Sequence, residues 1–181
     1  GHPLQKFSTG NLQTLGFTTR DDVIDFYTRY YSSNRMTLAV SGTQSLDELQ
    51  EMVVPRFYEI VDRNLDEITF PTEYLAPSSR FRLLQVKPLS EIRSLTLSFP
   101  LPSTQQYYSS QPLNLLGFLV GHEGKGSLLS LLKSKNLATG LSAGAGSSTN
   151  SYSSFEVTVQ LTPRGVDRSR DVITHLVQYL R

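Results

Sequence analysis

The residues that could bind a catalytic metal are few, and their spacing does not fit the known zinc-hydrolase motifs. The chain has three histidines and no cysteine. A helical H-E-x-x-H motif needs a second histidine four residues after the first, so that both imidazoles share one helix face. His122-Glu123 starts this pattern, but Gly126 stands where the second ligand belongs, and no histidine directly follows a glutamate. We therefore predict no catalytic residue and no metal site in this chain.

A second pattern could supply a nucleophilic serine. Residues 140–144 match G-x-S-x-G with Ser142 at the centre, and Asp171 and His175 follow in the chain order of a hydrolase triad. That motif works on a sharp turn between a strand and a helix, whereas here it runs into more small residues and another predicted strand. Asp171 and His175 also have the spacing of a surface pair on one helix face. A serine hydrolase is therefore a remote alternative.

The segment 137–146, LATGLSAGAG, is rich in glycine, alanine and serine. Small residues bury little surface and make a poor central strand. One interpretation is a mobile loop or a bulged edge. The other is an edge strand whose bare backbone accepts an extended peptide, because an edge offers unpaired N–H and C=O groups.

The elements that position these residues come in runs of helices and strands. Helical spacing of apolar residues predicts helices at 20–31, 46–60, 105–121, 127–134 and 163–180. Within 105–121, Pro112 indicates the start of a new helix. Apolar runs or alternation predict strands at 37–42, 81–86, 95–99 and 154–161. Residues 62–80 lose all periodicity and contain two prolines, which indicates a linker. The order of the elements indicates the α+β class, with a mixed or antiparallel sheet.

The bulk composition excludes several classes of partner. Seventeen basic and sixteen acidic residues give a net charge of +1, which argues against a nucleic-acid-binding face. The longest nearly apolar run, 113–120, is far shorter than the roughly 20 residues that span a bilayer, so we expect no membrane partner. The lack of cysteine fits a reducing compartment, and with no visible signal segment we expect a cytoplasmic location.

Three blocks of the sequence carry a family resemblance. They are HPLQKFSTGNLQTL at 2–15, YYSSNRMTLAVSGTQSLDELQEMVVPRF at 30–57 and LVGHEGKGSLLSLLKSKNLATGLSAG at 119–144. Together they resemble the insulin-degrading enzyme and nardilysin branch of the insulinase family, the M16 or pitrilysin-type zinc metalloproteases. The resemblance implies a large peptidase of four related α+β domains around a chamber, with helices packed on one face of each sheet. Its zinc motif lies ahead of the stretch matched by the first block.

The resemblance also implies how the chain is organised. Residues 1–68 match the rear of the first, catalytic domain without its zinc ligands, residues 69–80 a linker, and residues 81–181 the front of the second domain. The chain is then a non-catalytic fragment without a cofactor of its own, and zinc is expected in the parent. The implied partners are peptide substrates and the remaining domains of the parent protease.

In this branch the second domain carries an exosite that binds the amino-terminal end of a substrate as an added strand. The positions that match it here are Gly117, Gly121, Glu123, Leu141 and Ala143. Glu123 is suited to receive an α-amino group, since a carboxylate and an ammonium form a charge-assisted bond. The family often has glycine at the position of Ala143, and an aromatic or imidazole side chain where Asn114, Leu115 and Phe118 stand. The rival hypothesis is a structural, subunit-like scaffold domain with no ligand site.

Overall fold

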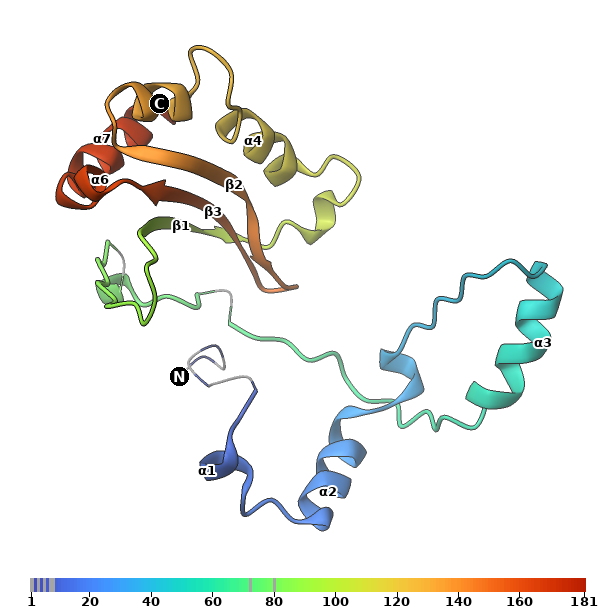
Figure 1. Cartoon of the computed structure of the whole chain (residues 1–181). Helices are drawn as coiled ribbons and strands as arrows, with labels where there is room; N and C mark the ends of the chain where they lie inside the picture. Colours follow the sequence, from blue (N-terminus) through green and yellow to red (C-terminus); the bar gives the residue numbers. More distant parts are fainter. Residues whose placement is uncertain (1, 3, 5, 7–8, 72, 80) are drawn as a thin grey trace. The chain divides into compact units, whose positions relative to one another are not determined.

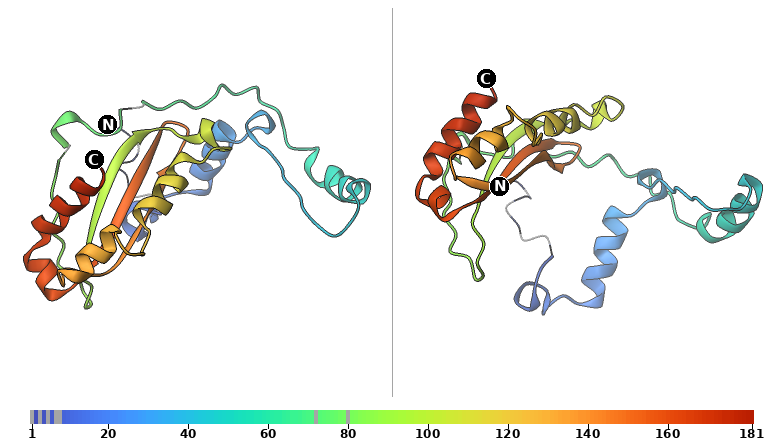
Figure 2. Two further views of the ribbon diagram at one scale, coloured as in Figure 1. Left: turned by 90° about the horizontal axis from the view of Figure 1, so that it is seen from above. Right: turned by 45° about the horizontal axis from the view of Figure 1, so that its top comes forward.

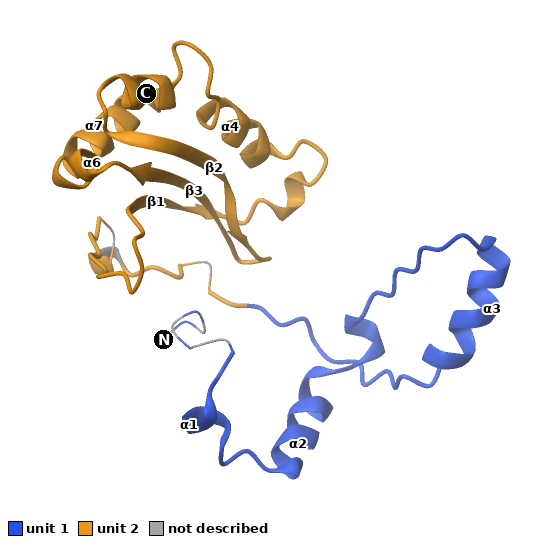
Figure 3. Ribbon diagram, viewed as in Figure 1, with its two compact units in different colours: residues 1–69 blue, residues 70–181 orange. Residues whose placement is uncertain are grey.

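The computed structural model describes residues 2, 4, 6, 9–71, 73–79 and 81–181. The chain forms two compact units, residues 1–69 and residues 70–181 (Figure 3). Residues 3, 5, 7 and 8 of the block at 2–15, and residues 72 and 80 of the predicted linker, lie outside the described residues.

Unit 1 consists of short helices joined by extended segments. They are α1 (Leu12–Leu15), α2 (Arg20–Tyr30), the 3-10 turn η2 (Ser33–Arg35) and α3 (Leu46–Phe57) (Figure 1). The helices predicted at 20–31 and 46–60 thus form. The prediction of a strand at 37–42 was wrong. A strand needs a neighbouring strand to form hydrogen bonds with, and the described part of this unit offers none.

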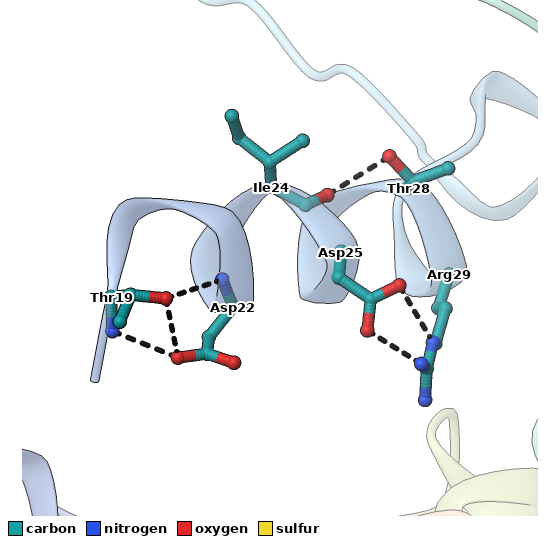
Figure 4. A network of polar contacts seen from close by, with 6 residues as sticks. All are labelled: Thr19, Asp22, Ile24, Asp25, Thr28 and Arg29. Carbon is teal, nitrogen blue, oxygen red and sulfur yellow. Dashed lines mark hydrogen bonds and ion pairs between the residues drawn. The ribbon is translucent and has the colours of Figure 1, made fainter. Parts of the chain in front are cut away.

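The helices of unit 1 begin at well-formed caps. The Thr19 hydroxyl accepts the Asp22 N–H at 3.2 Å, and the Asp22 carboxylate accepts the Thr19 N–H at 2.8 Å (Figure 4). Asp25 and Arg29 form an ion pair one turn later. Ser45 and Glu48 form the capping box expected for α3. Among the described residues of this unit only Ser32 is buried, so the apolar faces of α2 and α3 stay open.

Unit 2 is a three-stranded antiparallel sheet with helices. The strands are β1 (Ser94–Pro102), β2 (Ala138–Ser148) and β3 (Tyr152–Leu161), in the order β1-β3-β2. The helices are α4 (Pro112–Val120), α5 (Leu128–Ser134), α6 (Pro163–Asp167) and α7 (Ser169–Tyr179), with 3-10 turns η3 (Pro77–Ser79) and η4 (Gln105–Tyr107). The α+β class and the antiparallel sheet are confirmed.

Two elements of unit 2 differ from the prediction. The strand expected at 81–86 does not form, because no described strand pairs with it, and Leu84 stays exposed. Within 105–121 a new helix begins at Pro112, as expected, after Gln111 with a left-handed φ of 43°. The helix expected at 163–180 is broken at Arg168, whose φ of −111° and ψ of 33° are not helical.

The core of unit 2 lies on one face of the sheet, the face covered by α4, α5 and α7 (Figures 1 and 2). Its sheet side comes from alternating residues of β3, mainly Phe155, Val157 and Val159, with Leu141 of β2. Its helix side consists of Val120, Leu128, Leu129, Leu132, Val172 and Leu176. The opposite face is polar, and the hydroxyls of Thr96 and Thr158 lie 3.0 Å apart across β1 and β3. This alternation explains why the sheet has a single covered face.

A glycine brings α6 against the chain just before β2. A Cβ atom on Gly165 would lie 1.9 Å from the carbonyl oxygen of Leu137, which accepts the Thr162 N–H at 3.1 Å. We expect Gly165→Ala to lower the free energy of unfolding by about 1–3 kcal/mol, the usual range for overpacking a tight site, although alanine is normally favoured over glycine in a helix. Urea unfolding followed by circular dichroism measures the change.

The matched control is Gly140→Ala, where a Cβ would meet only the Gln160 side chain at 3.6 Å, an ordinary contact. We expect that variant to stay within about 0.5 kcal/mol of the parent. Equal stabilities for the two variants would contradict the close approach of α6.

The caps of α2 and α3 make a prediction for acidic solution. Hydrogen bonds from the hydroxyl and the N–H of Thr19 lower the pKa of Asp22, and those of Ser45 lower the pKa of Glu48. A carboxyl group whose pKa is lowered by folding stabilises the helix at every pH above the ordinary carboxyl pKa. That stabilisation is lost as the pH falls through the lowered pKa. We therefore expect the first turns of α2 and α3 to fray together in acid.

Carbon-13 titration of both carboxyl groups, read beside the amide shifts of the first helical turns, measures this. Thr19→Val removes one cap hydroxyl, so the pKa of Asp22 should rise while that of Glu48 stays as it was. If both move, or neither moves, the cap bonds do not set these pKa values.

Candidate functional site

The strand β2 lies at one edge of the sheet and pairs with β3 only. The segment 137–146 is therefore largely an edge strand, with register irregularities between Ala138 and Gly140 and between Ala145 and Ser148. The mobile loop was therefore wrong, and the segment is an edge with irregular register, as the bulged-edge interpretation expects. Whether this edge accepts a peptide stays a prediction. No strand among the described residues pairs with the other side of β2.

The register determines which backbone groups of β2 face outward. Leu161 of β3 donates its N–H to the Arg93 carbonyl oxygen next to β1, at 2.7 Å. Antiparallel ladders alternate, so odd-numbered residues of β3 bond to β1 and even-numbered ones to β2. Ser142, opposite Thr158, therefore bonds to β3. The outward N–H and C=O groups belong to the residues between the bonded ones: Leu141, Ala143 and Ala145.

Helix α4 runs close to this outward edge because position 117 is glycine. A Cβ on Gly117 would lie 2.8 Å from the Ala143 carbonyl oxygen and 2.9 Å from the Cα of Gly144. Gly121 ends the helix, and a Cβ there would lie 3.7 Å from the backbone nitrogen of Ala143. The contact at Gly121 is an ordinary one, so Gly117 is the glycine that lets the helix backbone approach Ala143.

A groove of 560 Å³ lies between α4, the turn after it and β2. The residues predicted as a substrate site all line it: Gly117, Gly121, Glu123, Leu141 and Ala143. The other lining residues are Asn114, Phe118, His122, Ser142 and Gly144. Asn114 and Phe118 stand where the resemblance implies aromatic or imidazole side chains, and sequence reasoning assigned no binding role in this groove to any of the five. The four-residue spacing of Asn114, Phe118 and His122 is the signal that could have found one side of the groove. The structure brings the five residues together, and their role in binding stays a prediction.

Glu123 carries the negative charge of the groove. Its side chain is 67% exposed, and its Oε2 atom lies 3.9 Å from the Nζ atom of Lys133 on α5. An exposed pair at this separation contributes at most about 1 kcal/mol. The next side chain, His122, accepts the Gly124 N–H at 3.4 Å on Nδ1. The Glu123 carboxylate is therefore accessible to a second cation.

The serine-hydrolase alternative receives no support from the geometry. Ser142 lines the groove beside α4, whereas Asp171 and His175 line a separate pocket of 280 Å³. The Asp171 carboxylate lies 2.5 Å from the Arg168 guanidinium. Ser142 is also followed by more strand and not by the helix that a nucleophile elbow requires.

The donor set of this chain does not fit a zinc ion. Within the described ranges, no three His, Cys, Asp or Glu side chains lie close enough together to hold a metal. His122 and Glu123 stand alone at the end of α4, with Gly126 where a second imidazole would be needed.

The helices of the described residues also include none that is long and apolar enough to cross a membrane.

Comparisons with known proteins agree with this architecture. Residues 18–181 match the family model described as the peptidase M16 inactive domain. The chain is 38% identical over 187 residues to the insulin-degrading enzyme-like 1, peroxisomal, of Arabidopsis thaliana, covering 99% of this chain and 19% of that protein. It is 37% identical over 194 residues to human nardilysin, covering 100% of this chain and 17% of that protein.

The crystal structure of pitrilysin has the same fold, with a TM-score of 0.79, 24% sequence identity, and coverage of 99% of this chain and 20% of that one. The chain therefore spans about a fifth of the length of the curated relatives it matches.

The contact between α4 and β2 makes a prediction of its own. In Gly117→Ala the new methyl group would meet backbone atoms of Ala143 and Gly144, which cannot rotate away. We expect a loss of about 1–3 kcal/mol in the free energy of unfolding, together with amide shift changes along α4. Thermal unfolding and a two-dimensional amide spectrum measure both.

Gly144→Ala is the matched control, because a Cβ there meets nothing within 4 Å. It should unfold like the parent chain and leave the amide shifts of α4 in place. A Gly117→Ala variant as stable as this control would mean that α4 does not rest on β2 at this point.

Proposed function

The chain belongs to the peptidase M16 family, and we propose that its second unit is a non-catalytic, peptide-binding part of an insulinase-like zinc metalloendopeptidase. In this proposal the amino-terminal segment of an extended peptide lies in the groove between α4 and β2. The peptide joins the sheet as an additional strand beside β2.

The free edge of β2 is the observation that carries the proposal. Leu141, Ala143 and Ala145 direct backbone N–H and C=O groups away from β3, and this stretch of strand lines the groove. An extended peptide can satisfy such groups whatever its side chains are, since the bonds involve only its backbone. The groove of 560 Å³ beside this strand supports the proposal, because it offers space for a second backbone.

Glu123 supplies an anchor for the end of the peptide. An α-amino group is a cation at neutral pH, and a carboxylate opposite an ammonium forms a charge-assisted bond. The Glu123 side chain is exposed and lines the same groove as the β2 edge. A peptide bound as a strand would therefore be held more firmly when its amino terminus is free.

In the parent protease, such a site would work at a distance from the zinc. Anchoring one end of a peptide raises its effective concentration at the active site without touching the chemistry. The zinc, the chamber and the contacts with the remaining domains are expectations for that longer protein. The cytoplasmic location also stays a prediction, and one relative carries the word peroxisomal in its name.

A scaffold domain without a ligand site is the second candidate. The observation that favours it is that close packing alone requires a glycine at 117, since any Cβ there would meet the backbone of β2. On this view the groove is only the rim of a helix–strand contact. The two candidates differ in whether the outward groups of β2 ever bind a peptide.

An amide chemical-shift titration of the labelled chain with an unmodified peptide of about 25 residues tests the proposal. We expect the largest shifts at the outward amides of Leu141, Ala143 and Ala145, and smaller ones at Ser142 and Gly144, which bond to β3. Acetylating the peptide or making Glu123→Gln should weaken binding about three- to tenfold, the range for losing an exposed charge-assisted contact.

Glu91→Gln is the matched control, because Glu91 is also exposed and lies 3.8 Å from a basic group, that of Arg93, outside the groove. It should bind the peptide like the parent chain. The absence of shifts at millimolar peptide would overturn the proposal and favour the scaffold. Equal shifts at outward and inward amides would argue against strand addition.

A further inference from the structure

Phe118 differs from the other residues that line the groove. It projects from α4 and is 73% exposed, whereas the apolar Leu141 on the strand side is only 9% exposed. The remaining lining residues are small or polar: Asn114, Gly117, Gly121, His122, Glu123, Ser142, Ala143 and Gly144. Phe118 is therefore the one large, accessible apolar surface that a ligand in this groove would meet.

Exposure alone does not distinguish this ring. Leu115 and Leu119 are on the same helix and are 61% and 54% exposed, but neither lines the groove. What separates Phe118 from them is its place beside the β2 edge, next to Gly117. The helix thus offers one apolar side chain to the groove and others elsewhere.

The distance between Phe118 and Glu123, the proposed anchor of the amino group, limits which residue of the peptide can reach the Phe118 ring. Phe118 precedes Gly121 by three residues, about 4.5 Å along the axis of a helix that rises 1.5 Å per residue. Glu123 lies two residues further on. A strand advances about 3.3 Å per residue, so the second and third residues of a peptide whose amino group lies at the end of α4 bracket this separation of about 4.5 Å.

We propose that Phe118 makes this groove selective for peptides with a free amino terminus and a large apolar side chain at the second or third residue. This rests on the proposed function, since it requires that a peptide binds along β2. Contact between that side chain and the ring removes apolar surface of both from water, which favours the bound state. The neighbouring Glu123 carboxylate disfavours an acidic residue there by like-charge repulsion.

The test uses polar host peptides of about 12 residues in which a single leucine is placed at position 2, 3 or 10, so that composition is constant. We expect the peptide with leucine at 2 or 3 to bind about three- to tenfold more tightly than the peptide with leucine at 10, the range for burying part of a leucine. Phe118→Ala should abolish this preference, and Phe118→Leu should keep most of it.

Leu119→Ala is the matched control, an exposed apolar side chain of the same helix outside the groove, and it should leave the preference unchanged. If Phe118→Ala keeps the preference while Glu123→Gln weakens all peptides, the inference about Phe118 is wrong and the proposed function stands. A stronger preference for arginine than for leucine at these positions would also overturn it, because the ring would then be binding cations. If no peptide binds at all, the proposed function fails and this inference with it.

Discussion

The close approach of α4 to the edge of β2 is the contact on which the groove depends. It is possible only because position 117 has no side chain: the helix backbone lies where a Cβ would collide with the Ala143 carbonyl oxygen. Any larger residue would push the helix outward, and backbone atoms on the strand cannot move aside as a side chain can. The two walls of the groove are therefore α4 and β2, whose backbones touch at Gly117 and Ala143.

The sheet explains why such an edge is stable. β2 contributes little apolar surface, since most of its residues from 138 to 148 are glycine, alanine or serine. It is held by the ladder to β3, which does bury a continuous apolar row, and by Leu141, which joins the core under α4 and α5. A strand of small residues can thus remain an edge because its neighbours do the packing.

The parts of this structure that local chemistry determines are the parts that the sequence predicts. The alternation that predicts β3 needs only neighbouring residues, and the strand forms. Helices α2, α3 and α6 likewise begin at the local side-chain caps of Thr19, Ser45 and Thr162. The strands expected at 37–42 and 81–86 do not appear, because an apolar run becomes a strand only when another strand pairs with it. The resemblance identified one set of lining residues, and four-residue spacing indicates that Asn114, Phe118 and His122 share one side of the helix. How closely that side approaches β2 depends on tertiary packing, which no spacing rule supplies.

The distribution of side chains in the groove determines how much of a peptide it can recognise. Backbone groups of β2 would bind any extended chain, so they contribute affinity without selecting a sequence. In the proposed complex, Glu123 would distinguish a free amino terminus from the interior of a chain, and Phe118, which lines the same groove, would add one apolar contact close to that terminus. A groove built in this way would recognise the end of a peptide and would not be selective for most of its sequence. That combination suits a site that must hold many different chains at a fixed distance from a separate centre of reaction, because selectivity at every position would exclude most of them.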